Sequence, residues 1–375
     1  MTNIQVKKIE LVEIKMQLQE PFQISSGTQY DRRILLLKFE DQSGHTAWSE
    51  CCAGNTPIYS PETTDTARLI LENFIIPDIL NVPFNHPSEV FAYINKTYKG
   101  HLMAKAAVEM GCWLIAAQIE GQSLASYIGG KHQRLKSGIS IGIQDSPEKL
   151  VEKVNGYLDE GYHKIKMKIK PGYDLAYVDA VRKHCGNGFD LMVDANNAYT
   201  LDDIAVLKKL DQYDLIMIEQ PLYWDDVFEH RDVQKQLKTP VCLDESIVTL
   251  KRAQEMIAHK SGRIINIKPG RLGGLRESIA VHDFCQENQI PVWCGGMLET
   301  GIGRAYNVAL ASLPNFTLPG DLSNSKRYWV QDVVSPEWQM DSEGYFQVPF
   351  DQPGLGVTVN EAYIDSIAIK KAAVS

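Results

Sequence analysis

Residues 164–170 read KIKMKIK and decide how the chain must fold. Apolar and basic residues alternate with a period of two, which predicts a β-strand with Ile165, Met167 and Ile169 on one face. The opposite face then carries four lysines. Lysines are common on exposed edge strands because they discourage aggregation. The rest of the chain decides between an exposed edge strand and a strand whose lysines face inward.

The region that contains this stretch alternates strand and helix patterns. Helix-like segments that open on Ser or Thr cap candidates separate the strands. Repeated strand–helix units of this length predict a parallel sheet, and eight in succession predict a closed barrel. The candidate strands are residues 137–143, 164–170, 189–194, 215–219, 241–244, 263–268 and 291–296, with a weaker eighth at 315–322.

A closed barrel gives the lysines of residues 164–170 a place. Helices cover one face of every strand, so that face must be apolar, while the other points into the barrel. Ile165 and its apolar neighbours therefore face the helices and the lysines face inward. Buried charge is costly, so we expect these lysines near the carboxyl ends of the strands, where active sites of this architecture lie. The same alternation turns Asn266 and Lys268 inward.

The two ends of the chain differ from this repeat. Residues 1–126 combine strand-like runs with helical ones and predict an α+β domain, in which the Gly and Ser residues of the stretch 21–31 favour a mobile loop. Residues 127–324 hold the repeated units. Residues 325–375 lose the repeat, and we expect them to pack against the first domain.

Composition excludes several classes of protein. The net charge of -9 argues against a nucleic-acid surface, which needs an excess of Lys and Arg. We find no secretory h-region and no run of about 18 apolar residues, so we expect no membrane span. The seven cysteines are odd in number and lack CxxC spacing, which favours a reducing, cytoplasmic compartment.

The strand ends carry a regular series of charged residues. Asp194, Glu219 and Asp244 each close an apolar strand and lie 25 residues apart (219 − 194 and 244 − 219). Lys168 and Lys268 occupy the equivalent positions one unit before and one unit after them. One strand–helix unit has about this length, so five consecutive strand ends read Lys, Asp, Glu, Asp, Lys.

Three converging carboxylates repel one another unless a cation joins them. Oxygen-only ligands at a site open to substrate favour Mg²⁺, with Mn²⁺ as a substitute. Neither His nor Cys occupies these positions, which argues against zinc. The alternative is a network of ion pairs between the carboxylates and the lysines.

The two lysines at strand ends lie on opposite sides of the predicted barrel. Strands 2 and 6 of an eight-stranded ring are opposite, so Lys168 and Lys268 would approach a substrate from opposite faces. This arrangement suits proton abstraction next to a carboxylate, with Lys168 as the base. A neutral lysine near pH 7 needs its pKa lowered by about three units. Lys166 lies about 6.5 Å from Lys168 along the strand, and its positive charge would supply about two of those units.

Several motifs together resemble the enolase superfamily, in its muconate-lactonizing-enzyme subgroup. The resemblance covers essentially the whole chain and implies a (β/α)₇β modified TIM barrel with an α+β capping domain. The motifs are KMK at 166–168, DANNAY at 194–199, IEQPL at 218–222, LDES at 243–246, INIKPGRLGG at 265–274 and WCGGMLETGIGRA at 293–305.

Within that subgroup, residues 295–305 and LPGDLSNSKRYW at 318–329 are similar to the o-succinylbenzoate synthase and N-succinylamino acid racemase family. The resemblance implies a homo-oligomeric enzyme for a small-molecule carboxylate. It implies that Lys168 and Lys268 are the acid/base pair, and that Asp194, Glu219 and Asp244 bind Mg²⁺. The loops 21–30 and 51–60 would form a lid. The pocket would be lined by Ser140, Asn196, Gly295, Gly296 and Met297.

The resemblance leaves two activities open. One is the syn dehydration of 2-succinyl-6-hydroxy-2,4-cyclohexadiene-1-carboxylate in menaquinone biosynthesis, and the other is racemisation of N-acylamino acids. Arg271 matches an arginine of racemase-capable members and would contact substrate, or it forms an ion pair at the barrel rim. An aldolase that forms a Schiff base on Lys268 is an alternative of another class, which leaves the carboxylates and Lys168 unexplained.

Overall fold

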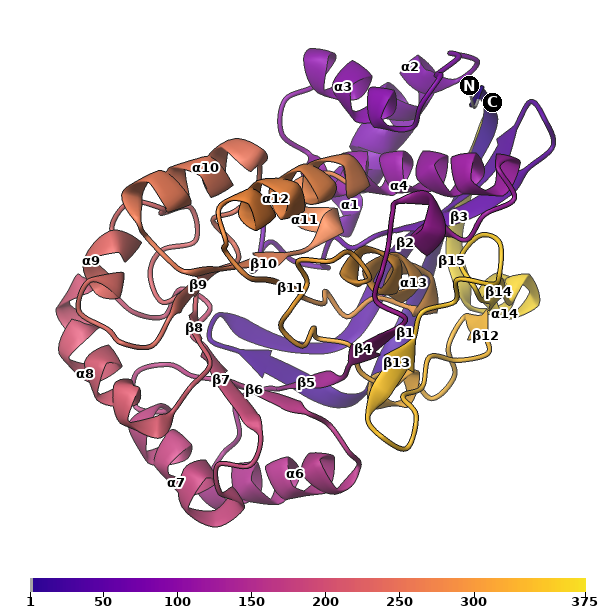
Figure 1. Cartoon of the computed structure of the whole chain (residues 1–375). Helices are drawn as coiled ribbons and strands as arrows, with labels where there is room; N and C mark the ends of the chain where they lie inside the picture. Colours follow the sequence, from indigo (N-terminus) through magenta and orange to yellow (C-terminus); the bar gives the residue numbers. More distant parts are fainter. Residues whose placement is uncertain (1–2) are drawn as a thin grey trace.

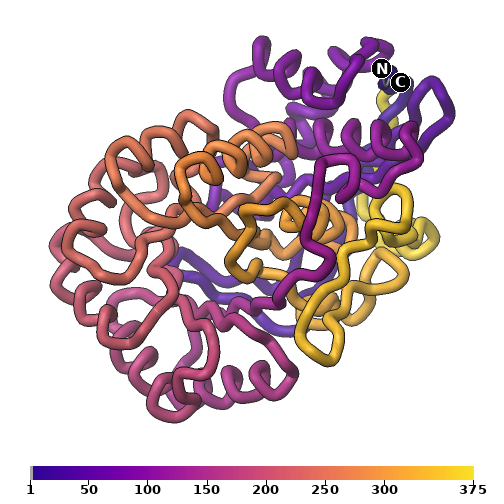
Figure 2. Tube along the Cα trace, in the orientation of Figure 1, coloured from indigo at the N-terminus to yellow at the C-terminus, as the bar shows by residue number. Residues whose placement is uncertain are grey.

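The computed structural model describes residues 3–375, so the first two residues of the predicted capping domain lie outside the described residues. An antiparallel sheet of four strands, in the order β15-β1-β2-β3, joins the two ends of the chain. The chain ends therefore lie side by side in Figures 1 and 2. The strands are β1 (Val6–Ile24), β2 (Gly27–Asp41), β3 (Thr46–Cys51) and β15 (Ala368–Val374).

The stretch predicted as a mobile loop is instead part of a long β-hairpin. β1 and β2 continue their pairing as far as Ile24 and Gly27, with a register shift between Gln17 and Phe22. Ser25 and Ser26 form the tight turn at the tip, and Gly27 begins β2. Figure 1 shows this hairpin extending from the sheet toward the barrel. The prediction of a loop was wrong because alternating side chains on both arms favoured pairing over the local turn signals.

Helices follow the sheet and pack against it. α4 is apolar around most of its circumference, and it packs against β3 and α11. Among residues 3–375, α4 alone has the length and composition to span a membrane, and 83% of it is buried inside the protein. Its buried Lys105 and Glu109 interrupt the apolar run. These helices are α1 (Thr64–Ile70), η1 (Leu71–Ile75), α2 (Ile76–Ile79), α3 (Ser88–Thr97), α4 (Leu102–Ile119) and α5 (Leu124–Tyr127).

The repeated units form a parallel sheet of seven strands in sequence order, from β5 to β11. Lys168 pairs in register with Asp194, and Asp194 with Glu219, so the charged strand ends meet at one level. The strands are β5 (Gly138–Ile141), β6 (Lys164–Lys168), β7 (Asp190–Asp194), β8 (Ile218–Glu219), β9 (Val241–Leu243), β10 (Ile264–Ile267) and β11 (Val292–Cys294).

The predicted eighth strand does not form as a regular strand. In residues 315–322 only Phe316 makes a bridge, to Val292 of β11. Farther along, Asp321 N donates to Cys294 O at 2.8 Å, and Gly138 N of β5 donates to Leu322 O at 3.1 Å. Pro319 has no N–H to donate, which breaks the ladder. This irregular segment bonds to both edge strands, so the (β/α)₇β architecture is confirmed.

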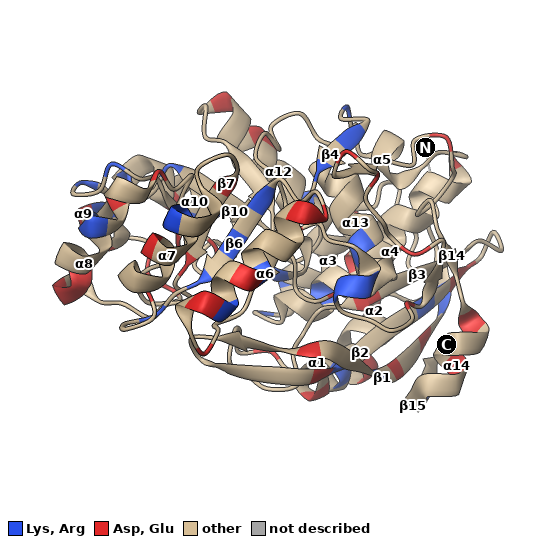
Figure 3. Ribbon diagram, turned by 90° about the horizontal axis from the view of Figure 1, so that it is seen from below, with Lys and Arg blue, Asp and Glu red and all other residues tan. Residues whose placement is uncertain are grey.

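Helices surround the sheet on its outer side (Figure 1). Ile165 and Met167 face them and have no exposed surface, as the alternation predicts. Figure 3 shows acidic and basic residues mixed over the outer helices, in contrast to the lysine row of β6. The helices are α6 (Pro147–Asp159), α7 (Leu175–Cys185), η2 (Leu201–Asp203), α8 (Ile204–Lys209), η3 (Leu210–Tyr213), α9 (His230–Gln234), α10 (Leu250–His259), α11 (Pro269–Leu272), α12 (Leu275–Glu287) and α13 (Gly301–Ala311).

Apolar and lysine side chains fill the barrel interior beneath the carboxyl ends of the strands. Met192, Met217 and Trp293 belong to a small separate core, and Lys164 Nζ lies 4.1 Å from the centre of the Trp293 ring. Lys164 and Lys166 are 0% and 2% exposed and face inward as predicted, whereas Lys170 lies beyond the end of β6, over the Tyr173 ring. A cation over an aromatic face offsets part of the cost of burying it.

The last part of the chain fills the space beside the barrel and then returns to the first sheet. β13 pairs with β4, β12 with β14, and β15 with β1. The remaining elements are β4 (Arg134–Lys136), η4 (Ser325–Arg327), β12 (Val334–Ser335), β13 (Tyr345–Gln347), β14 (Thr358–Val359) and α14 (Glu361–Ile367).

Candidate active site

A cavity lies at the carboxyl ends of the barrel strands and is closed by the first sheet and its loops. Lys166, Lys168 and Lys268 line it from the barrel. Phe22 and Ile24 line it from the β1–β2 hairpin, whose Ser25 Oγ donates to Asn196 O at 2.7 Å. A second group, from Gly54 to Ser60, follows β3. Both segments predicted as lid loops therefore contribute walls.

Two lysines of β6 contact the first two carboxylates. Lys168 Nζ donates to Asp194 Oδ2 at 2.6 Å. Lys166 Nζ lies 2.9 Å from the same oxygen and 2.7 Å from Glu219 Oε2. All four side chains are at least nine-tenths buried. At these distances in a low-dielectric interior, each charge depends strongly on its neighbours.

The pKa values of the two lysines shift in opposite directions. Burial is the largest influence on Lys168 and, together with the nearby Lys166, lowers its pKa despite the opposing effect of Asp194. Burial also acts against the charge of Lys166, but Asp194, Asp321 and Glu219 outweigh it and raise its pKa well above the ordinary value. Lys166 therefore stays cationic beside a more easily neutralised Lys168. The sequence argument attributed most of the lowering of the Lys168 pKa to Lys166, whereas burial contributes more than Lys166 does.

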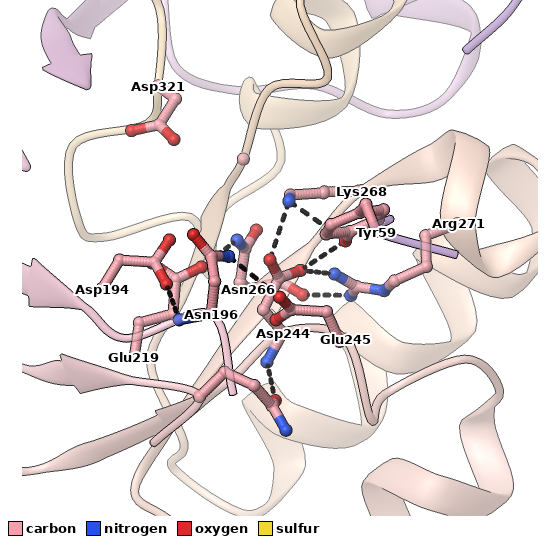
Figure 4. A network of polar contacts seen from close by, with 12 residues as sticks. Tyr59, Asp194, Asn196, Glu219, Asp244, Glu245, Asn266, Lys268, Arg271 and Asp321 are labelled. Atoms are coloured by element: carbon pink, nitrogen blue, oxygen red, sulfur yellow. Dashed lines mark hydrogen bonds and ion pairs between the residues drawn. The ribbon is translucent and has the colours of Figure 1, made fainter. Parts of the chain in front are cut away.

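The third carboxylate, Asp244, is held from the other side of the barrel (Figure 4). Lys268 Nζ donates to Asp244 Oδ2 at 2.7 Å and to Tyr59 Oη at 3.1 Å. Tyr59 Oη in turn donates to Asp244 Oδ1 at 3.0 Å. Arg271 donates to the same Oδ1, and its Nε donates to Ile247 O at 2.8 Å. Burial acts to lower the pKa of Lys268, but Tyr59 and the surrounding acids raise it overall.

Buried oxygen atoms without hydrogen-bond partners gather around these carboxylates. They are Asn196 Oδ1, Glu219 Oε2, Glu245 Oε2 and Asn266 Oδ1. Glu219 Oε2 has only the ion pair to Lys166, in a geometry that makes no hydrogen bond. Buried oxygen without a donor is costly, and a bound divalent cation satisfies several such atoms at once. This donor set, made only of oxygen, fits Mg²⁺.

The carboxylates do not form a finished metal cage. Within residues 3–375, no three His, Cys, Asp or Glu side chains are grouped closely enough to hold an ion. Instead, Asp194 and Glu219 contact Lys166, while Asp244 contacts Lys268 and Arg271. The ion-pair network that the sequence left open as an alternative is thus present, and it occupies the same oxygens that would bind Mg²⁺.

The residues predicted to bind substrate separate into two groups. Ser140, Asn196, Gly296 and Met297 line the cavity. Arg271 is not part of the cavity wall and lies behind Asp244, 3% exposed. Gly295 lies outside the wall too, but a Cβ there would come within 2.6 Å of Lys268 Cε. Glycine at 295 therefore leaves room for the Lys268 side chain.

Sequence reasoning missed several side chains of the site. Tyr59 reaches it from the segment after β3, and nothing in the sequence indicated its contact with Lys268. Glu245 accepts from Asn196 Nδ2 at 2.9 Å, and its position directly after Asp244 was a usable signal. Asp321 accepts from Lys164 Nζ at 2.9 Å and lies 3.3 Å from Lys166 Nζ. It comes from the irregular segment that was predicted as a strand.

Comparisons with known proteins agree with this arrangement. Residues 7–129 match the model of the mandelate racemase / muconate lactonizing enzyme N-terminal domain, and residues 149–363 match the enolase C-terminal domain-like model. The chain is 47% identical over 358 residues to an o-succinylbenzoate synthase of Bacillus subtilis, covering 96% of this chain and 95% of that one. It is 44% identical over 363 residues to an N-succinylamino acid racemase of Amycolatopsis, covering 97% of each.

Solved structures give the same result. A crystal structure of an enolase-superfamily member from Listeria innocua is 37% identical, covers 99% of both chains and has a TM-score of 0.94. The family resemblance read from the motifs is confirmed. With its capping sheet, its (β/α)₇β barrel and these relatives, the chain belongs to the enolase superfamily, in the family of o-succinylbenzoate synthases and N-succinylamino acid racemases.

Proposed function

We propose that this enzyme is an o-succinylbenzoate synthase. Its substrate would be 2-succinyl-6-hydroxy-2,4-cyclohexadiene-1-carboxylate, which loses water to give the aromatic product in menaquinone biosynthesis. The observation that carries the proposal is the placement of Lys168 and Lys268 in one cavity, on strands four positions apart in the sheet order, with three strand-end carboxylates between them. The named relatives support the same reaction.

The lysines would divide the chemistry. Lys168 Nζ accepts the proton from the carbon that bears the carboxylate, and the C–O bond to the hydroxyl then breaks. In a syn elimination both groups leave from one face, so the same Lys168 ammonium returns its proton to the departing hydroxide as water. Lys268, held cationic by its neighbours, stabilises the negative charge that develops on the substrate carboxylate.

Asp194, Glu219 and Asp244 would hold Mg²⁺, supported by the orphaned oxygens around them. When bound, the ion supplies further stabilisation of charge on the substrate carboxylate. Asn196 orients Asp194 and Glu245. Its backbone N–H donates to Asp194 Oδ1 at 2.9 Å, and its side-chain Nδ2 donates to Glu245 Oε1 at 2.9 Å. Ser140 Oγ is buried at the cavity wall without a partner and would contact the substrate.

Racemisation of N-succinylamino acids is a second candidate for the same site. The observation in its favour is that Lys268 also lines the cavity, so that a proton removed by one lysine can be replaced by the other from the opposite face. A relative at 44% identity bears the name of that activity. The aldolase alternative is less favoured, because a Schiff base needs a neutral lysine and Lys268 is paired with Asp244.

The test compares wild type, Lys168→Ala and Lys268→Ala with Mg²⁺, using the cyclohexadiene precursor and N-succinyl amino acids as substrates. We expect dehydration by wild type and none by Lys168→Ala. Racemisation, measured by the change in optical rotation, should need both lysines, whereas α-proton exchange in deuterated buffer needs only the lysine that removes the proton. Dehydration at an undiminished rate by Lys168→Ala would contradict the proposal.

We also propose that residues 1–126 and 325–375 form the capping domain and that residues 127–324 form the catalytic barrel. A cytoplasmic homo-oligomer is the expected form of the enzyme. Sedimentation or light scattering of the purified protein tests the oligomeric state.

A further inference from the structure

Two buried arginines lie in the cavity wall apart from the lysines and carboxylates described above. Arg32 comes from β2 of the first sheet and is 2% exposed, whereas Arg304 comes from the first turn of α13 and is 3% exposed. Both side chains line the same cavity as Lys168 and Lys268. The reaction proposed above gives neither arginine a role.

Few of the donors on these arginines are used. Arg32 Nη2 donates to Cys52 O at 3.1 Å, and Arg304 Nη1 donates to Ser323 through its carbonyl and, at 3.3 Å, its hydroxyl. The Nε of each arginine is buried without a hydrogen-bond partner. Within residues 3–375, no carboxylate oxygen approaches either guanidinium to within the 4.0 Å of an ion pair.

Two other buried arginines of this protein have acidic partners. Arg68 is 4% exposed and pairs with both Glu13 and Glu72. Arg271 pairs with Asp244. A buried guanidinium is costly unless an anion and hydrogen bonds compensate it. Arg32 and Arg304 therefore differ from the rest by lacking an anion of their own.

Two acids of this region are engaged elsewhere: Glu299 lines the same cavity, and Glu50 is close enough to Arg32 for their charges to interact. Glu50 accepts from the backbone N–H groups of Thr300 and Gly303 and from the Thr300 hydroxyl. Glu299 accepts from Asn307 Nδ2 at 3.0 Å. These acids moderate the positive charge of this end of the cavity, but they leave the orphaned Nε donors unused.

We infer that Arg32 and Arg304 bind a second carboxylate of the substrate, remote from the one at the reaction centre. A guanidinium presents two parallel N–H donors that fit a carboxylate. Phe22, Ile24 and Leu298 also line the cavity, which suits an apolar body joining two charged ends. The inference rests on the proposed function and assigns to these arginines the terminal carboxylate of the succinyl arm.

The alternative is a purely structural role, since each arginine also bonds to a backbone carbonyl. Experiments on wild type with altered substrates avoid that difficulty. N-succinyl, N-succinamoyl and N-acetyl derivatives of one amino acid differ in the terminal carboxylate, which is present, replaced by a carboxamide of similar size, or absent. We expect kcat/KM for the succinyl compound to exceed that for the other two by roughly 10- to 100-fold, mostly through KM.

Variants assign that preference to residues. Arg32→Gln and Arg304→Gln should lose most of the preference while keeping the kcat/KM for the N-acetyl substrate. Arg327→Gln is a matched control, because Arg327 also has a buried, unpartnered Nε but lies outside the cavity wall and has Glu20 at 3.7 Å. Arg32→Lys and Arg304→Lys keep the positive charge but lose the paired N–H donors of the guanidinium. They replace the glutamine variants in the same assay if those variants do not fold.

Equal kcat/KM for the succinyl and succinamoyl compounds would overturn the inference and leave the proposed function standing. Equal losses on every substrate in both arginine variants would show a structural role and would also overturn it. If wild type turns over none of these substrates, racemisation fails as the second candidate function, and the proposed dehydration still stands. Calorimetry with the Mg²⁺-loaded protein then decides the inference: o-succinylbenzoate should bind at least about tenfold more tightly than its analogue with a remote carboxamide.

Discussion

The two ends of the cavity are built in opposite ways. At the barrel end, every strand-end acid contacts a cation at short range, as in the 2.6 Å contact of Lys168 with Asp194. At the end near α13, Arg32 and Arg304 form no ion pair with any acid of residues 3–375, and the Nε of each is buried without a partner. Apolar side chains from the β1–β2 hairpin also line the cavity. The difference indicates that the acids and lysines at the barrel end balance one another before substrate binds. The arginines at the other end gain an anionic partner only when a substrate carboxylate binds.

Removing the proposed base, Lys168, should have the largest effect on the reaction rate. Lys168→Ala deletes the side chain that would move the proton, and general acid–base catalysis is worth about 10² to 10⁴ in rate. We expect dehydration to fall by at least about 10³-fold in kcat, measured by the ultraviolet absorbance of the substrate.

The same stretch of sequence supplies the control. Lys170, two residues farther along, ends outside β6 and lies over the Tyr173 ring with its Nζ 4.7 Å from the ring centre. Lys170→Ala should keep kcat within about twofold of wild type. A similar loss in both variants would mean that the barrel is damaged rather than the base removed.

Magnesium removal tests the acids at the same end. Dialysis against EDTA should abolish dehydration, and Mg²⁺ or Mn²⁺ should restore it, because both accept oxygen ligands. Zn²⁺ should restore much less. Asp244→Asn should raise the Mg²⁺ concentration needed for half-maximal activity by about tenfold or more. Full activity in EDTA would remove the metal from the proposal.

The same contrast explains which features the sequence predicted. Asp194, Glu219 and Asp244 end short apolar strands at equal spacing. Parallel register places Asp194 level with Glu219, and Asp244 follows two residues beyond Cys242, the partner of Glu219. Local pattern and regular geometry suffice for such residues. The inward turn of Asn266 followed from the period-two alternation of its strand in the same way, and its Nδ2 donates to Glu219 at 2.8 Å.

Residues at the other end depend on chain segments that the local pattern does not place. Tyr59 meets Lys268 across 209 positions of sequence, and Arg32 meets the cavity only because the β1–β2 hairpin extends to the barrel. Residues 315–322 failed as a strand because Pro319 and Gly320 interrupt the ladder, so the position of Asp321 was unpredictable. Arg271 was predicted to contact substrate or to form an ion pair, and it pairs with Asp244 without lining the cavity.

Tyr59 reaches the barrel end from the segment after β3, and its removal should have a moderate effect. Its hydroxyl accepts from Lys268 and donates to Asp244, so Tyr59→Phe removes two hydrogen bonds while keeping the ring. We expect a loss of about 2- to 10-fold in kcat. Racemisation should lose more than dehydration, because it requires proton transfer by Lys268. Tyr223→Phe is the control, since Tyr223 is 62% exposed.

The smallest effect should concern stability at the α13 end. Burial, the largest influence, raises the pKa of Glu50 to about 7 despite its bond to Thr300. The unfolded chain has an ordinary glutamate pKa near 4.5. Below that pH both states hold the proton. As the pH rises from there to about 7, the unfolded state releases its proton first, so folding loses stability, by up to about 3 kcal/mol.

Glu50→Gln removes this titration while keeping a side chain of the same size. Melting temperatures of wild type and variant, measured from pH 5 to pH 8, should therefore diverge, with wild type losing more as the pH rises. Glu40→Gln is the control, because Glu40 is exposed beside Lys7 and its pKa is lowered rather than raised. If the melting temperatures of wild type and Glu50→Gln stay parallel across that range, Glu50 is ionised in the folded protein. The end of the cavity near α13 would then carry a full negative charge, which would weaken the attraction of Arg32 for a second carboxylate.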